Sequence, residues 1–153
     1  LTLAKHPSET DERVMVRLIG FALYASETLI FGKGLSDETE PDLWQKDLTG
    51  AIELWMVVGL PTEKNIRKAC GRARKVIALL YGGRVANMWW EQNSKDLLKL
   101  NNLVVINLPE TLSLANHAER NMSISCSIQD GQFLFSHDAG SIDLSLIYLK
   151  TIS

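Results

Sequence analysis

One segment, residues 50–69, constrains the fold of this chain more than any other, because it changes from the pattern of a strand to that of a helix. An apolar run of strand length ends at Gly59, and the apolar spacing beyond it is helical. Thr62 is placed to cap that helix, and Ile66 and Ala69 fall on one of its faces. The segment therefore predicts a central strand that leads directly into a helix.

Glu53 is the only charged side chain in this predicted strand. Successive side chains of a strand point to opposite faces, so Glu53 shares a face with Trp55 and Val57. A buried charge is costly unless it has a partner. Two interpretations stay open. Glu53 lies at the strand end and reaches solvent or pairs with an arginine, or it is a metal-binding or catalytic carboxylate at the mouth of the sheet.

The rest of the chain divides into further helices and strands. Helices are predicted at residues 9–25, 85–93 and 109–120. The first helix carries an apolar stripe of Val14, Leu18, Phe21 and Ala25, flanked by Met15, Ile19 and Ala22. Strands are predicted at residues 1–5, 28–31, 75–81 and 103–107, and a C-terminal antiparallel meander at residues 122–129, 132–135 and 142–152. Residues 35–49 are polar and acidic, which predicts a surface loop.

The charge balance limits the kind of partner. With 16 Lys and Arg against 18 Asp and Glu, the chain lacks the basic excess of an obligate nucleic-acid binder. Its most basic cluster follows the central strand and comprises Lys64, Arg67, Lys68, Arg72, Arg74 and Lys75. This cluster is either the solvated outer face of an amphipathic helix or a local basic stripe, so nucleic acid and protein partners both stay open.

Length and composition predict a single domain over residues 1–153, since 46% of the 153 residues are hydrophobic. No apolar run approaches the roughly 20 residues that span a bilayer, so we expect no membrane segment. Cys70 and Cys126 lie far apart without metal-type spacing, which favours buried thiols and a cytoplasmic location. The chain opens at Leu1 in the pattern of a strand already under way, which predicts a missing N-terminal piece.

Several short motifs, spread over almost the whole chain, carry a family resemblance. They are His6-Pro7-Ser8-Glu9-Thr10, Glu40-Pro41-Asp42-Leu43-Trp44, Ile52-Glu53-Leu54-Trp55, Trp89-Trp90-Glu91-Gln92-Asn93 and Ile128-Gln129-Asp130-Gly131. Together they resemble the YaeQ family. The resemblance implies a PD-(D/E)XK nuclease-like fold, an α+β fold with a mixed β-sheet flanked by helices and a restriction-endonuclease-like core. It also implies further strand residues ahead of Leu1, and hence an N-terminal truncation.

The resemblance also implies a site. In such nucleases a helix glutamate, a strand aspartate and a further strand acid gather Mg²⁺, and a lysine assists. Carried over to this sequence, the metal ligands are Glu12 (or Glu9), Asp42 and Glu53, and the catalytic lysine is Lys64 or Lys68. The lysine has to come from the next helix because Trp55 occupies its usual position. A second departure is Val57, which stands where the family pattern has an acidic residue.

Two functions follow from these observations. One is a divergent Mg²⁺-dependent phosphodiesterase. The other is a catalytically inactive nuclease-fold protein that acts as a binding or regulatory module. They differ in geometry, because Mg²⁺ bonds oxygen at roughly 2.1 Å and the carboxylates of Glu12, Asp42 and Glu53 would have to converge within about 5 Å of one point.

Overall fold

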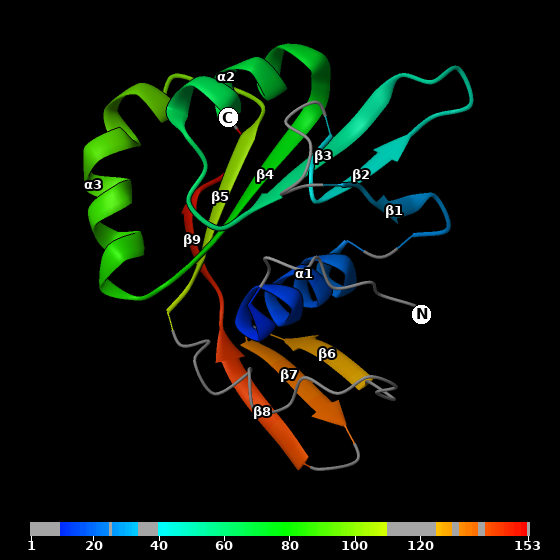
Figure 1. Cartoon of the computed structure of the whole chain (residues 1–153), viewed down its shortest axis with the longest axis vertical. Coiled ribbons are helices and arrows are strands. Elements are labelled where there is room, and N and C mark those ends of the chain that lie inside the picture. Colours follow the sequence, from blue (N-terminus) through cyan, green and yellow to red (C-terminus); the bar gives the residue numbers. More distant parts are fainter. Residues whose placement is uncertain are drawn as a thin grey trace.

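The structure is a computed structural model that describes residues 10–24, 26–33, 40–109, 125–129, 132–137 and 140–152; in 125–129, 132–137 and 140–144 it describes the backbone alone. In chain order the elements are α1 (Asp11–Leu23), β1 (Leu29–Phe31), β2 (Leu43–Lys46), β3 (Ile52–Val58), α2 (Glu63–Arg72), β4 (Ala73–Tyr81), α3 (Arg84–Leu97), β5 (Leu103–Leu108), β6 (Ser125–Gln129), β7 (Gln132–His137), β8 (Gly140–Ser145) and β9 (Ile147–Lys150). Figure 1 shows their arrangement.

Two sheets organise these elements. The larger sheet has six strands in the order β1-β2-β3-β4-β5-β9, in which β3, β4 and β5 are parallel and the other pairs are antiparallel. The smaller sheet pairs β6, β7 and β8 in antiparallel fashion. The predicted α+β class with a mixed sheet is therefore confirmed. The central segment is also as predicted, since Thr62 caps α2 by accepting the Asn65 N–H at 3.2 Å and both Ile66 and Ala69 are buried.

The predicted C-terminal meander is correct in part. Residues 142–152 were expected to form one strand, but they divide between β8, in the smaller sheet, and β9, which pairs with β5. The division falls at Leu146, whose side chain is buried in the core beside α1. Burial of this side chain anchors the chain between the two sheets, and the strand pattern cannot reveal which sheet each half joins.

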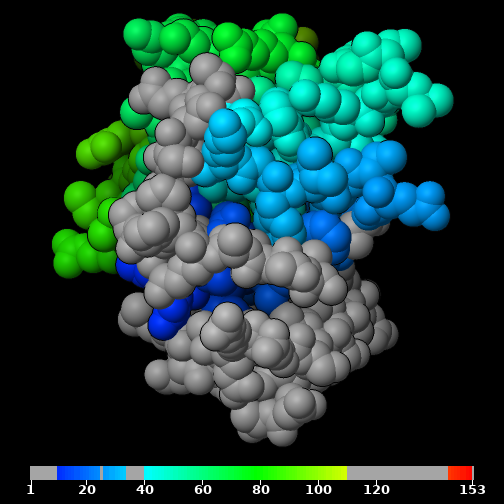
Figure 2. All heavy atoms as spheres, turned by 45° about the vertical axis from the view of Figure 1, so that its right-hand side comes forward, coloured from blue at the N-terminus to red at the C-terminus, as the bar shows by residue number. Residues whose placement is uncertain are grey.

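The polar segment at residues 35–49 is not a loop throughout, so that prediction was wrong for its second half. Residues 43–46 form β2, which pairs with β1 and β3. Leu43 is fully buried, and Trp44 packs edge-on against Trp55 with ring centroids 6.0 Å apart. On the face shown in Figure 2, β1 and β2 (light blue to cyan) lie below α2 (green). The predicted strand at residues 1–5 and helix at residues 109–120 fall outside the described residues, apart from Pro109.

Helices cover both faces of the larger sheet. On one face α2 and α3 pack over Trp55, Val76 and Leu80. On the other face α1 packs over Met56 and Leu79. Cys70, on α2, is half-buried, and burial raises the pKa of its thiol to about 11. Among the described residues, no helix combines the length and apolar character that a membrane span requires.

Helix α1 is buried on all sides in its middle turns. Every residue from Met15 to Gly20 is buried, including Val16, which lies about 200° around the helix from Val14 in the predicted stripe. Figure 1 shows why, because α1 lies between the six-stranded and the three-stranded sheets. A helix that is buried all round needs apolar cover on both sides, so the amphipathic interpretation was incomplete.

Gly20 allows α1 to lie close against the larger sheet. A Cβ at this position would lie 2.5 Å from Met56 Sδ and 3.3 Å from Leu79 Cδ2. We expect Gly20→Val to lower the free energy of unfolding by roughly 1–3 kcal/mol, because overpacking forces neighbours from their rotamers. Urea unfolding measures this change. Gly71→Val is the matched control, since no atom lies within 4 Å of the added Cβ; an equal loss in both variants would contradict the close approach.

Tyr24, at the C-terminal end of α1, makes stability sensitive to alkali. Burial, with a smaller contribution from Tyr148, raises the pKa of Tyr24 to about 12 from the ordinary value of 10.0. The folded state therefore keeps this proton at pH values where the unfolded chain loses it. Its contribution to stability is complete below about pH 10 and is lost as the pH rises towards 12. We expect urea midpoints to fall between pH 10 and pH 12, and to fall less in Tyr24→Phe; an equal fall in both proteins would disprove the assignment.

Candidate functional site

The carboxyl ends of the parallel strands β3, β4 and β5 lie at one edge of the larger sheet, and α2 and α3 begin there. Ligands of open sheets with parallel strands commonly bind at this edge. The first turn of α1 reaches the same edge, because Arg13 donates to the Val58 backbone oxygen at 3.3 Å. Thr10 caps this turn by accepting the Arg13 N–H at 3.1 Å. The turn thereby places Arg13 next to the end of β3, and Glu12 precedes it in the same turn.

Asp42 lies at this edge in a buried position, 4% exposed. Its Oδ1 accepts from the Arg13 guanidinium at 2.7 Å, and its Oδ2 accepts from the Val58 N–H at 2.8 Å. Its own N–H donates to the Met56 oxygen at 3.0 Å, which extends the ladder between β2 and β3 by one residue ahead of the start of β2. Both carboxylate oxygens are thus engaged within the protein, and the charge has the partner that a buried carboxylate needs.

Glu12 differs from Asp42. Its Oε2 is buried and has no hydrogen-bond partner in the part of the chain that the structure describes. An unsatisfied buried polar atom costs roughly 1–3 kcal/mol, so such atoms are uncommon in folded proteins. Among the described residues, Glu12 is therefore a predicted metal ligand with a buried oxygen left for another group.

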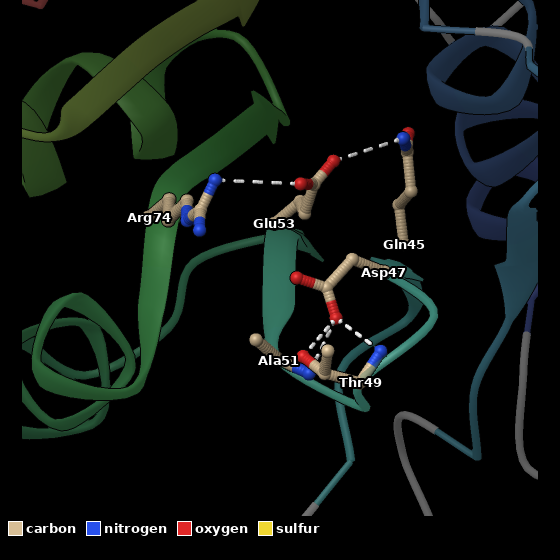
Figure 3. A network of polar contacts seen from close by, with 6 residues as sticks. All are labelled: Gln45, Asp47, Thr49, Ala51, Glu53 and Arg74. Atoms are coloured by element: carbon tan, nitrogen blue, oxygen red, sulfur yellow. Dashed lines mark hydrogen bonds and ion pairs between the residues drawn. The ribbon is translucent and has the colours of Figure 1, made fainter.

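Glu53 lies near the start of β3, beside the hairpin that joins β2 to β3 (Figure 3), whereas Asp42 contacts the last residue of β3. Its Oε1 is 3.5 Å from Arg74 on β4, and its Oε2 accepts from Gln45 on β2 at 3.5 Å. Val58 lies five positions further along the strand, a distance of about 16 Å. Glu53 thus matches the interpretation of a strand-end glutamate paired with an arginine, and the structure does not bring it together with Glu12 and Asp42.

The hairpin beside Glu53 is held by Asp47. Its Oδ1 accepts from the Thr49 hydroxyl at 2.6 Å and from the N–H groups of Thr49 and Ala51 at 2.8 Å and 3.0 Å (Figure 3). The Thr49 hydroxyl, with smaller contributions from the backbone and Arg74, lowers the pKa of this carboxyl. Asp47 is thus occupied in shaping the turn between β2 and β3.

Lys64 and Lys68 lie on the exposed face of α2, opposite the buried Ile66 and Ala69. Their side chains start from the solvent side of the helix, and no contact joins either of them to Asp42 within the described residues. Of the basic cluster, Lys64, Arg67, Lys68 and Arg72 lie on the exposed side of α2, whereas Arg74 and Lys75 belong to β4.

Mg²⁺ does not fit the described residues at this edge. They include no group of three or more His, Cys, Asp or Glu side chains that could hold a metal ion. Of the predicted ligands, Asp42 is engaged on both oxygens and Glu53 lies at the other end of β3, which leaves Glu12. Glu9 lies outside the described residues. The sequence interpretation missed Arg13, and its only signal was a cation next to the predicted ligand Glu12.

These features define an α+β protein with an open, mixed six-stranded sheet and an arginine–carboxylate pair at the end of its central strand. The chain belongs to the YaeQ family, since the family model "YaeQ protein" matches residues 1–146. It is 39% identical over 148 residues to the uncharacterized protein YaeQ of Escherichia coli (strain K12), covering 95% of this chain and 82% of the relative. The uncharacterized protein YaeQ of Salmonella typhi is 40% identical over 148 residues, which again cover 95% of this chain and 82% of the relative.

Solved structures of the family have the same fold. The crystal structure of YaeQ from Xanthomonas axonopodis pv. citri matches with a TM-score of 0.95 and 44% identity, over 99% of this chain and 86% of that one. The crystal structure of YaeQ from Pseudomonas syringae matches with a TM-score of 0.89 and 32% identity, over 97% and 83% of the two chains. The fold described above is therefore that of the family.

Proposed function

We propose that this protein is a nuclease-fold binding or regulatory module that does not cleave phosphodiesters with the help of a metal. The mixed sheet with helices on both faces supports the nuclease-like part of this assignment. The Arg13–Asp42 ion pair carries the rest, because its guanidinium, 2.7 Å from Oδ1, supplies the positive charge that a divalent cation would supply to this carboxylate.

The same pair opposes metal binding energetically. A cation approaching Asp42 meets the guanidinium of Arg13 and has to displace it. Separating a buried ion pair costs about 3–5 kcal/mol, which weakens metal binding by roughly two to four powers of ten. Millimolar Mg²⁺ is then too dilute to compete.

A divergent Mg²⁺-dependent phosphodiesterase is the second candidate, and one observation favours it. The buried, unpartnered Oε2 of Glu12 is an oxygen of the type that Mg²⁺ prefers, and it lies in the turn that also carries Arg13. In this alternative Glu12 contributes to a metal site whose other ligands come from outside the described set.

Calorimetric titration of Mg²⁺ and Mn²⁺ separates the two candidates. We expect no saturable binding to the unmodified chain at millimolar metal, and no cleavage of DNA or RNA. Arg13→Gln is expected to permit weak binding, because it removes the competing cation. Binding by the unmodified chain that Glu12→Gln abolishes and Glu53→Gln preserves would establish the second candidate and refute the first.

The partner that we propose for this module is a nucleic acid held through its phosphates. Lys64, Lys68 and Arg72 follow each other at four-residue spacing along the exposed face of α2, and within the described residues none of them has an ion pair. Arg67 and Arg74, by contrast, pair with Glu63 and Glu53. Like charges at this spacing destabilise a helix slightly, so folding alone does not favour the stripe.

Salt dependence tests this partner. With EDTA present to exclude metal, we expect anisotropy of a labelled DNA duplex to report weak binding whose affinity falls with a log–log slope of roughly −2.7 for three phosphate contacts. The triple variant Lys64→Gln, Lys68→Gln, Arg72→Gln should lose this binding. The control Lys33→Gln, Lys95→Gln, Lys99→Gln removes the same charge elsewhere and should retain it. If both triple variants lose DNA binding equally, the binding depends on net charge alone and not on the stripe on α2.

A further inference from the structure

The turn between β4 and α3 leaves the start of α3 without a side-chain cap. Gly82 and Gly83 make this turn with φ of 114° and 63°, and Gly83 is the N-cap. The first N–H groups of a helix have no acceptor within the helix. Of the described residues, none accepts a hydrogen bond from the N–H groups of Arg84, Val85 or Ala86. Within the described part of the chain, three backbone donors at the carboxyl end of β4 are therefore without an acceptor.

Asn107 provides an independent second observation. It lies at the end of β5 opposite Leu80, is 3% exposed, and its Oδ1 has no partner among the described residues. Its Nδ2 donates to Oδ1 of Asn87 on α3 at 3.4 Å, so the amide is directed at the first turns of that helix. A buried amide oxygen without a partner is costly, and packing would be served better by an apolar residue.

Charge at this helix end favours an anion. The first turn of α3 contains no acidic residue and begins with the exposed cation Arg84. The positive end of the helix dipole adds to this charge. By contrast, α1 and α2 have threonine caps and acidic residues in their first turns.

We propose that the start of α3 binds an oxyanion, namely the phosphate of a small phosphomonoester. The N–H groups of Arg84, Val85 and Ala86 donate to the phosphate oxygens, and the Arg84 guanidinium offsets their charge. Rotating the amides of Asn87 and Asn107 by 180° reverses the hydrogen bond between them and gives Asn107 Nδ2 as a further donor. This site uses neither Asp42 nor the stripe on α2, so it stands separately from the proposed function.

Nuclear magnetic resonance on ¹⁵N-labelled protein tests the site. Inorganic phosphate and ribose 5-phosphate are titrated in separate arms, with acetate as the carboxylate arm and chloride as the ionic-strength control. We expect saturable shifts of the Arg84, Val85 and Ala86 amides, with ribose 5-phosphate bound more tightly than acetate. Shifts that do not saturate, or that chloride reproduces, would overturn the proposal.

Two variants of Arg84 distinguish the contribution of its backbone N–H to phosphate binding from that of its charged side chain. Arg84→Ala removes the guanidinium alone, whereas Arg84→Pro also removes the N–H, at the helix position that proline tolerates best. We expect Arg84→Pro to bind phosphate roughly tenfold more weakly than Arg84→Ala, since a hydrogen bond to a charged group is lost. Equal affinities would show that the backbone does not hold the anion.

Asn107→Leu tests the role of Asn107 in a variant that is expected to stay folded. The substitution removes the unpartnered oxygen and keeps the same branched arrangement of four side-chain heavy atoms, so we expect the Tm to be retained or raised while phosphate affinity falls severalfold. Unchanged phosphate affinity in a folded Asn107→Leu variant would exclude Asn107 from the site.

Discussion

Replacing Arg13 by leucine is expected to lower the free energy of unfolding by about 3–5 kcal/mol, because it leaves the Asp42 carboxylate buried without its cation. Asp42 is 4% exposed, and the Val58 N–H at 2.8 Å would be its only remaining partner among the bonds described above. A single domain of this size has roughly 5–15 kcal/mol of stability, so the loss is a large share of the total.

A double-mutant cycle isolates the contribution of the pair. We expect Arg13→Leu combined with Asp42→Asn to be much less destabilised than the sum of the single variants, because no buried charge remains unpaired. Urea unfolding of the four proteins gives the coupling energy.

The exposed pair Glu53–Arg74 is the matched control for this cycle. Its atoms are 3.5 Å apart, and the Arg74 side chain is 71% exposed. Exposed ion pairs contribute about 0–1 kcal/mol, so Arg74→Leu is expected to change stability little. If Arg13→Leu proves as mild as Arg74→Leu, the Arg13–Asp42 pair is not a buried one, and the argument against metal binding at Asp42 fails with it.

The sequence pattern correctly predicted those helices and strands that depend on neighbouring residues in the chain. The cap at Thr62 and the buried face of α2 at Ile66 and Ala69 depend on residues within one or two turns, and both are present. The apolar runs of β4 and β5 lie in the centre of the sheet, where every side chain is covered and only length and composition matter. β2 was missed because half of its four residues are polar and its burial depends on β1 and β3.

The site could not be predicted in the same way, because its contacts join residues far apart in sequence. Arg13 and Asp42 are 29 positions apart, and nothing between them indicates that α1 brings a cation to the end of β3. Glu53 was correctly placed in a strand, but its place at the far end of β3 from Asp42 follows from the register between β2 and β3. A resemblance that names three carboxylates does not supply that register, so their convergence had to be tested in space.

The burial of Val16 gives the second large effect, since this residue separates the two descriptions of α1. A helix with one apolar stripe centred on Val14 and Leu18 would expose Val16, whereas a helix between two sheets buries it. The structure leaves Val16 0% exposed and Val14 only partly buried. We therefore expect Val16→Asp to lower the free energy of unfolding by more than about 4 kcal/mol, as an unpaired buried charge does, and Val14→Asp to cost much less.

Milder substitutions keep this comparison measurable when Val16→Asp does not fold. Val16→Ala removes two buried methyl groups and is expected to cost about 2 kcal/mol in urea unfolding, against less than about 1 kcal/mol for Val14→Ala. The ratio is the informative quantity, because both substitutions change helix propensity equally. A larger loss at Val14 than at Val16 would restore the single-stripe helix and remove the smaller sheet as a cover for α1. The predicted order instead makes that sheet part of the core, where it holds α1 and therefore Arg13 in place against the end of β3.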